Sequence, residues 1–108
     1  YQLGLLAYRL LTGAWPWPDG DPDQPRSRLD PAMEPVAPSR RIADPAHRRL
    51  VAGDLDAIVL KCLRHSPGER YRTMAEVRDD LARHRAHQPV LARRQTLRYR
   101  ATRFVRRH

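Results

Sequence analysis

The first thirteen residues of the chain, YQLGLLAYRLLTG, are apolar around almost the whole circumference of a helical wheel. Gln2 and Arg9 are the strongly polar side chains, and they stand seven positions apart on one narrow face. This pattern predicts a helix that is enclosed by protein on every side. Gly13 is placed to adopt the left-handed conformation that ends a helix, and Pro16 follows where a helix could not continue. No N-cap precedes the helix, so we interpret the chain as a fragment of a longer protein.

A second, amphipathic helix is predicted to begin at Asp54, whose side chain is a good N-cap. Its apolar positions recur at helical spacing, which places them in one buried stripe. The members of this stripe are Leu55, Ile58, Val59, Cys62 and Leu63. Ser66-Pro67-Gly68 should end this helix, and a short helical turn is expected upstream of it, from residue 45 to residue 51, ending at Gly53.

A third helix is predicted to open with the capping box Thr73-Met74-Ala75-Glu76 and to stop near Pro89. Its predicted apolar face consists of Met74, Val77 and Leu81. Asp79 stands four residues before Arg83, which is the spacing of an ion pair on a helix surface. No strand pattern occurs along the chain, so the predicted fold class is all-α.

Proline dominates the connection between the first and second helices. Eight of the ten prolines lie between Pro16 and Pro45, a density that excludes a long helix or a central strand. We therefore expect a long Pro-rich loop with at most one helical turn near residues 31–34. Within it, Asp19, Asp21 and Asp23 imitate the start of a calcium loop. Because Gln24 stands where that loop requires glycine, we expect a solvated acidic turn.

The net charge of +9 is confined to the C-terminal part of the chain. Residues 1–82 hold all twelve acids and twelve Lys and Arg, whereas residues 83–108 hold nine arginines and no acid. A basic helix is predicted from about residue 96 to residue 107, with an apolar side that includes Phe104. The rest of its surface carries the candidate tail binding surface, Arg98, Arg100, Arg103, Arg106 and Arg107. An apolar stripe backed by arginine suits an anionic membrane surface, which we favour over a solvated tail and over a nucleic-acid arm.

The remaining composition restricts the class of protein. A length of 108 residues fits one small domain. The single Cys62 excludes an internal disulfide. No apolar run is long enough to span a membrane and no signal peptide is visible, so we expect the chain to be soluble. We expect it in the cytoplasm, at the inner face of the membrane if the parent protein has a transmembrane segment. His84 and His87 are expected to be exposed residues and not zinc ligands, because no further Cys or His lies near them in the sequence.

Several short motifs, taken in order, resemble protein kinases. Residues 1–4 and 11–17 resemble the large central helix of the kinase C-lobe and the turn after it, where kinases carry D-x-[WY]-x-x-G. Lys61, Leu63, Pro67 and Arg70 resemble the segment K-x-L-x-x-x-P-x-x-R-x-[ST] near the end of the kinase domain, with Thr73 one position beyond its [ST]. Residues 53–61 and the basic run from Gln88 look like bacterial serine/threonine kinases of the eukaryotic type. In that subgroup the basic run joins the kinase domain to a transmembrane helix or sensor.

The resemblance implies a C-terminal lobe fragment of such a kinase: C-lobe helices of the protein kinase-like fold, a long Pro-rich loop and a basic C-terminal helix. It implies a partial kinase domain at residues 1–88 and a basic juxtadomain or juxtamembrane tail at residues 89–108. The Gly-rich loop, strand lysine, H-R-D and D-F-G motifs of kinases do not occur in the sequence. We therefore expect no catalytic, cofactor or metal-binding residue and no activity in this chain alone, with ATP and magnesium belonging to the parent kinase. Its expected partners are the kinase N-lobe and catalytic segments, with no small-molecule substrate.

Arg70 matches the kinase arginine that forms a structural ion pair with a glutamate at the end of the activation segment, upstream of Tyr1 in the family. A buried guanidinium without its partner is costly, so we expect Arg70 to reach solvent or to pair with a local acid. An alternative function stays open. The chain would then be a small helical binding module whose Arg-rich tail docks nucleic acid or acidic partners.

Overall fold

The computed structural model describes residues 1–16, 35–64 and 66–95. They form the helices α1 (Gln2–Thr12), η1 (Pro38–Arg41), α3 (Pro45–Val51), α4 (Asp54–Cys62), η2 (Pro67–Glu69) and α5 (Met74–Arg85), where η denotes a 3₁₀ helix. Residues 91–95 are also helical. No strand occurs within these ranges, which confirms the all-α fold class. The predictions for the Pro-rich loop, its aspartates and the basic tail from residue 96 fall outside the described residues.

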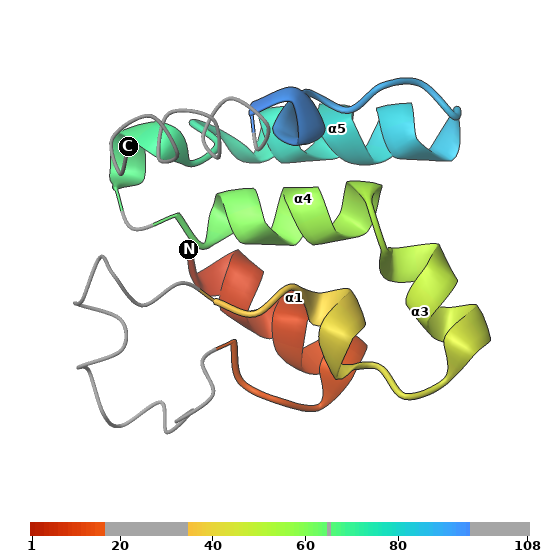
Figure 1. The fold of residues 1–108 in the computed structure, drawn as a ribbon. Helices are drawn as coiled ribbons and strands as arrows, with labels where there is room; N and C mark the ends of the chain where they lie inside the picture. The colour runs from red at the N-terminus through yellow and green to blue at the C-terminus, as the bar shows by residue number, and fades with distance from the viewer. Residues whose placement is uncertain (17–34, 65, 96–108) are drawn as a thin grey trace, which may run out of the picture.

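Helix α4 lies at the centre of the assembly (Figure 1). Helix α5 packs along one side of it and α1 along the other, while α3 and η1 adjoin it as well. Five of its nine residues are buried: Ala57, Ile58, Val59, Lys61 and Cys62. The sequence pattern assigned the enclosed position to α1, and the structure assigns it to α4.

The buried side chains of α4 face two different neighbours. Val59 and Leu63 pack with Tyr8 of α1, whereas Ala57 and Ile58 pack with Val90 and Ala92. Four residues of the predicted stripe are buried and Leu55 is partly buried, and the stripe divides between two apolar clusters. Apolar side chains on both sides of a helix are what packing between two layers requires.

Helix α1 is covered on one side only. Gly4 and Tyr8 are buried against α4, but Leu3, Leu6 and Leu10 are 36%, 57% and 77% exposed. The prediction of complete enclosure is therefore wrong. The described helices that contact α1 most closely are α4 and η1. An apolar pattern shows that a face can be buried, and it does not show that a partner is present.

Gly4 marks the closest approach between α1 and α4. A Cβ atom built at Gly4 would lie 2.8 Å from the Cβ of Cys62 and 3.1 Å from the side chain of Leu63. Glycine is favoured here because the two helix backbones come too close for a side chain unless the helices shift apart. This is the glycine of the kinase-like motif at the start of the chain.

The helix ends confirm most of the local predictions. Gly13 has φ 72° and its N–H donates to the carbonyl of Arg9 over 2.8 Å, as expected of a left-handed C-cap. The guanidinium of Arg9 lies 4.5 Å from the ring centroid of Trp15, so this aromatic packs back on α1. The short helix from residue 45 is present as α3, with Asp44 accepting from the N–H of Ala46.

Two details of the starts of α4 and α5 differ from expectation or refine it. The N-cap of α4 is Gly53, so Asp54 is the first helical residue and the predicted cap is wrong by one position. The capping box of α5 is confirmed, because Thr73 Oγ1 accepts from the N–H of Glu76 over 3.2 Å. The Glu76 carboxylate accepts in turn from the N–H of Arg72 over 2.9 Å.

The predicted apolar face of α5 is partly wrong. Val77 is buried, but Met74 and Leu81 are exposed, and the second buried position of the helix is Asp80. The predicted surface pair also shifts by one residue, since Arg83 contacts Asp80 at 2.8 Å and Asp79 is exposed. A buried, hydrogen-bonded carboxylate has thus taken the place that an apolar side chain was expected to fill.

Candidate functional site

The outer side of α1 exposes three large apolar side chains. Leu3, Leu6 and Leu10 recur at spacings of three and four, so they form one stripe along the helix, opposite the side that packs on α4. A row of leucines exposed in this way is typical of a surface that meets another part of a protein. We refer to these three residues as the leucine face.

Arg70 lies at the N-terminal end of the same helix. Its guanidinium stands 4.6 Å from the ring centroid of Tyr1, and its Nε donates to the carbonyl of Arg64 over 2.6 Å. The side chain is partly buried, held between an aromatic face and a backbone oxygen. The structural ion pair assigned to Arg70 stays a prediction. Tyr1 and Arg70 come from motifs at opposite ends of the kinase-like pattern. The fold brings their side chains into contact.

Lys61 is an unusual buried lysine of α4. Its Nζ lies 5.0 Å from the ring centroid of Tyr71, and the residue is 7% exposed. Burial lowers the pKa of the Lys61 ammonium group, and the charge of Arg64 lowers it further. The aromatic face of Tyr71 offsets part of this cost by a cation–π contact.

Asp80 was missed by the sequence analysis. The residue is 0% exposed, and its carboxylate accepts from the Tyr71 hydroxyl over 2.5 Å and from Arg83 Nη1 over 2.8 Å. Burial by itself raises the pKa of Asp80, but the hydrogen bonds to the carboxylate outweigh it and leave the pKa lowered. The pKa of the Tyr71 hydroxyl shifts the other way: burial and the neighbouring Asp80 carboxylate raise it.

Partly buried hydrogen bonds hold η1 on α4 and hold the residues that flank the segment 17–34 on α1. Asp56 accepts from both the N–H and the hydroxyl of Ser39, over 2.9 and 2.5 Å, which ties η1 to the first turn of α4. The Tyr8 hydroxyl donates to the carbonyl of Val36 over 2.5 Å, and the Val36 N–H donates to Pro16 over 2.8 Å. Residues on either side of the segment 17–34 are thereby held together on α1.

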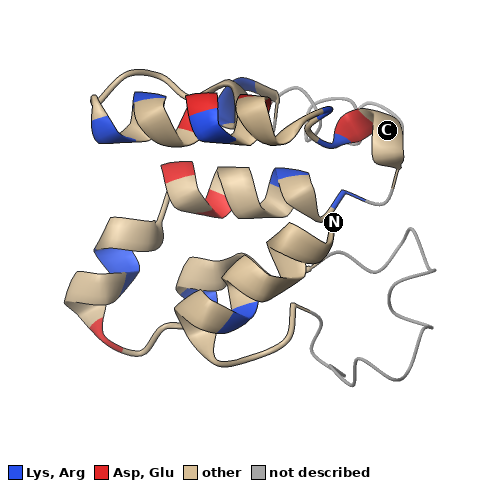
Figure 2. Ribbon diagram, turned by 180° about the vertical axis from the view of Figure 1, so that it is seen from behind, with Lys and Arg blue, Asp and Glu red and all other residues tan. Residues whose placement is uncertain are grey.

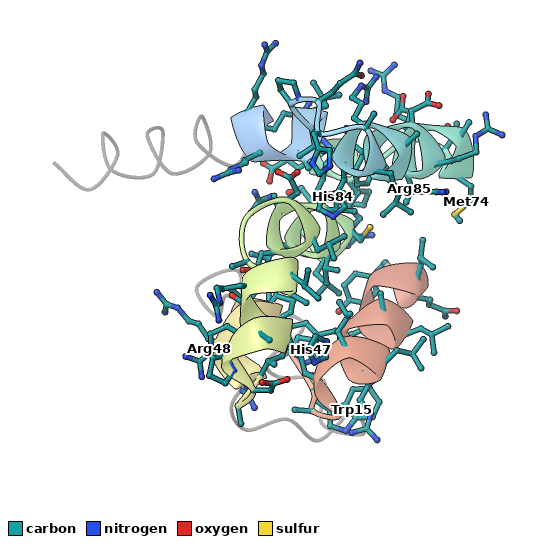
Figure 3. All side chains as sticks on the ribbon, turned by 90° about the vertical axis from the view of Figure 1, so that its right-hand side faces the viewer. Trp15, His47, Arg48, Met74, His84 and Arg85 are labelled. Atoms are coloured by element: carbon teal, nitrogen blue, oxygen red, sulfur yellow. The ribbon has the colours of Figure 1, made fainter. Side chains whose placement is uncertain are left out.

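His84 is half-buried and pairs across helices, so the prediction that it is an exposed residue is wrong. Figure 2 shows that the acidic start of α4 lies beneath the C-terminal end of α5, and in Figure 3 His84 points from α5 toward α4. Its Nδ1 lies 2.9 Å from Asp54 Oδ2, while Arg93 reaches the other oxygen of Asp54 at 3.4 Å. His87 is exposed, as predicted, and ends α5 with φ 58°. Among the described residues no group of His, Cys, Asp or Glu could hold a metal ion.

Tyr1 and Arg70 are thus in contact, and Gly4 packs on α4. The chain is 43% identical over 83 residues to a serine/threonine-protein kinase PknB of Mycolicibacterium smegmatis. It is 38% identical over 89 residues to the PknB of Mycobacterium leprae and 42% identical over 83 residues to that of Mycobacterium tuberculosis. These matches cover 77–82% of the chain.

The chain is homologous to a segment in the C-lobe region of bacterial serine/threonine protein kinases. It spans 12–13% of the length of these relatives. No family model and no solved structure matches it. The family resemblance is confirmed, and the alternative of an independent binding module is not favoured. None of the described helices is long and apolar enough to cross a membrane.

Proposed function

We propose that the chain supplies the closing helices of the catalytic domain in a kinase that transfers phosphate from ATP to serine or threonine of proteins. The observation that carries this proposal is the 43% identity to a bacterial serine/threonine kinase over 83 residues. ATP and magnesium would be held by the Gly-rich loop, strand lysine and H-R-D and D-F-G segments, whose motifs this sequence does not contain. The role of these helices is therefore support of the catalytic machinery, not chemistry.

The leucine face is the surface through which this support would act. Leu6 and Leu10 are more than half exposed, and fully burying a leucine contributes about 1.5–3 kcal/mol. Covering both by the catalytic segments and the N-lobe would stabilise the whole domain by a few kcal/mol. Gly4 and Tyr8 on the opposite side already fix α1 on α4, so the leucines face outward from a fixed frame.

The same proposal divides the chain into the end of the kinase domain at residues 1–88 and a basic tail at residues 89–108. Val90 and Ala92, at the start of this tail, are packed against α4. Arg98, Arg100, Arg103, Arg106 and Arg107 would meet an anionic membrane at its cytoplasmic face, where each arginine near the lipid contributes about 1 kcal/mol.

A chimera tests the proposed function. The segment of the Mycolicibacterium smegmatis PknB that matches this chain would be replaced by the chain's own residues, and incorporation of phosphate from labelled ATP would be measured. We expect the folded chimera to phosphorylate itself and a protein substrate in the presence of magnesium. A folded chimera without phosphate transfer, beside an active unmodified PknB, would contradict the proposal.

Two leucine variants of this chimera separate the role of the leucine face from a general loss of stability. Leu6→Ser should lower both phosphate transfer and the melting temperature, because it places a hydroxyl in the proposed contact. Leu50→Ser is the matched control, since Leu50 is also exposed, at 71%, but lies on α3. Equal effects of the two substitutions would argue against a special role for α1.

A further inference from the structure

Asp80 holds the beginning of the C-terminal helical stretch. Its Oδ1 accepts from the N–H of Leu91 over 2.8 Å, and its Oδ2 accepts from the N–H of Ala92 over 3.0 Å. These are the first two residues of the helical stretch 91–95. The first N–H groups of a helix have no partner within the helix, and a carboxylate is their strongest acceptor. Here the carboxylate comes from another helix, eleven and twelve positions upstream.

The same carboxylate is fixed from its own side. Tyr71 donates to Oδ2 and Arg83 to Oδ1, so each oxygen of Asp80 accepts two hydrogen bonds. A buried charge with this many donors is well solvated by the protein, and the guanidinium of Arg83 balances it. Tyr71 and Arg83 therefore hold the Asp80 carboxylate independently of residues 91 and 92.

Two further contacts hold the same stretch on α4. Val90 and Ala92 are 1% and 0% exposed and pack with Ala57 and Ile58. Arg93 reaches Asp54 at the start of α4. The segment from Val90 to Arg93 is thus held by packing, by a buried carboxylate and by a surface ion pair.

We infer that Asp80 is the positioning residue of the basic tail, which it fastens to α4 and α5 by capping the helical stretch that begins at Leu91. The point from which the tail arginines continue is then a fixed part of the domain. A surface that binds those arginines would be coupled mechanically to α4 through Asp80. The inference rests on contacts of residues 71–93 and does not depend on the proposed kinase activity.

Amide hydrogen exchange of the 108-residue chain, followed residue by residue, tests this inference. Asp80→Asn keeps the shape of the side chain but removes the charge and one acceptor. We expect exchange at Leu91 and Ala92 to accelerate at least tenfold, with exchange at Ile58 changed much less. The matched control is Asp79→Asn, which changes the neighbouring exposed carboxylate and should leave all of these amides within twofold of the unmodified chain. Equal exchange at Ala92 in the two variants would overturn the inference.

A second variant decides the outcome if Asp80→Asn unfolds α4 and α5 together. Leu91→Pro removes one donor to Asp80 and leaves the carboxylate intact, and proline is tolerated in the first turn of a helix. We expect the amide of Ala92 to exchange several-fold faster in this variant, and trypsin to cleave after Arg93 and Arg94 several-fold faster, while α4 keeps its protection. Unchanged exchange at Ala92 and unchanged cleavage would overturn the inference.

Discussion

Substitution of Gly4 by alanine tests the packing of α1 on α4. The added methyl group would lie 2.8 Å from Cys62 Cβ and 3.1 Å from both Cγ and Cδ2 of Leu63. The first of these atoms is attached directly to the backbone of α4 and cannot turn away. Accommodation of the methyl group therefore requires the two helices to separate by several tenths of an ångström.

Two opposing effects set the magnitude. Replacing glycine by alanine inside a helix stabilises it by roughly 0.5–1 kcal/mol, because alanine loses less backbone entropy on folding. Overpacking of a buried contact costs about 1–3 kcal/mol. We expect the packing cost to prevail, so that Gly4→Ala lowers the free energy of unfolding by about 0.5–2 kcal/mol. For a domain of this size each kcal/mol corresponds to roughly 4–8 °C in Tm.

Thermal and urea unfolding followed by circular dichroism measure this change. Gly68→Ala is the control, because a Cβ at Gly68 meets no atom within 4 Å, and its effect should stay within about 0.5 kcal/mol. Adding Cys62→Ala to the Gly4→Ala variant should not restore stability, because alanine retains the Cβ that causes the clash. If Gly4→Ala were as stable as the unmodified chain or more stable, helix propensity alone would govern this position and the close approach of α1 and α4 would be refuted.

Three further predictions concern Asp80, Tyr8 and the tail. The folded-state pKa of Asp80 is lowered, so the ionised Asp80 carboxylate stabilises the fold above the ordinary pKa of 3.8. This stabilisation is lost as the pH falls from 3.8 toward the lowered pKa. Below pH 3.8 the free energy of unfolding should therefore fall less steeply with pH in Asp80→Asn than in the unmodified chain. Tyr8→Phe removes the donor to Val36 and should lower the free energy of unfolding in urea by about 0.5–1.5 kcal/mol; no change would contradict the contact. Replacing the five arginines from Arg98 to Arg107 by glutamine should abolish co-sedimentation with phosphatidylglycerol vesicles at low salt; equal binding to phosphatidylcholine vesicles would contradict an electrostatic contact.

Local signals in the sequence were sufficient for the elements that local interactions build. The capping box at Thr73, the left-handed position at Gly13 and the proline at the start of α3 each act within one helical turn, so their effect is visible in neighbouring residues. Gly4 of the kinase-like motif is packed in α1, and Tyr1 lies at the N-cap of the same helix. The all-helical structure confirms the predicted fold class, and the sequence relatives confirm the family resemblance.

The features that the sequence did not reveal depend on partners far along the chain. Asp80 is buried because its donors come from residues 71, 83, 91 and 92, and no periodicity within α5 marks it as the capping acid. Asp56 accepts from Ser39, which lies seventeen positions upstream, so no local pattern marks that contact. The central position of α4 also escaped prediction, because small Ala57 and the buried stem of Lys61 extend its packed surface beyond the apolar stripe.

The central claim is that the leucine face of α1 is an interface with the rest of a kinase domain. It is tested most directly by Leu6→Cys, with maleimide labelling of that cysteine measured by mass spectrometry in the 108-residue chain and in the PknB chimera. The buried Cys62 serves as an internal reference in both proteins. We predict rapid labelling of position 6 in the chain alone and protection of at least tenfold in the chimera, whereas equally rapid labelling in a folded, active chimera would contradict the account.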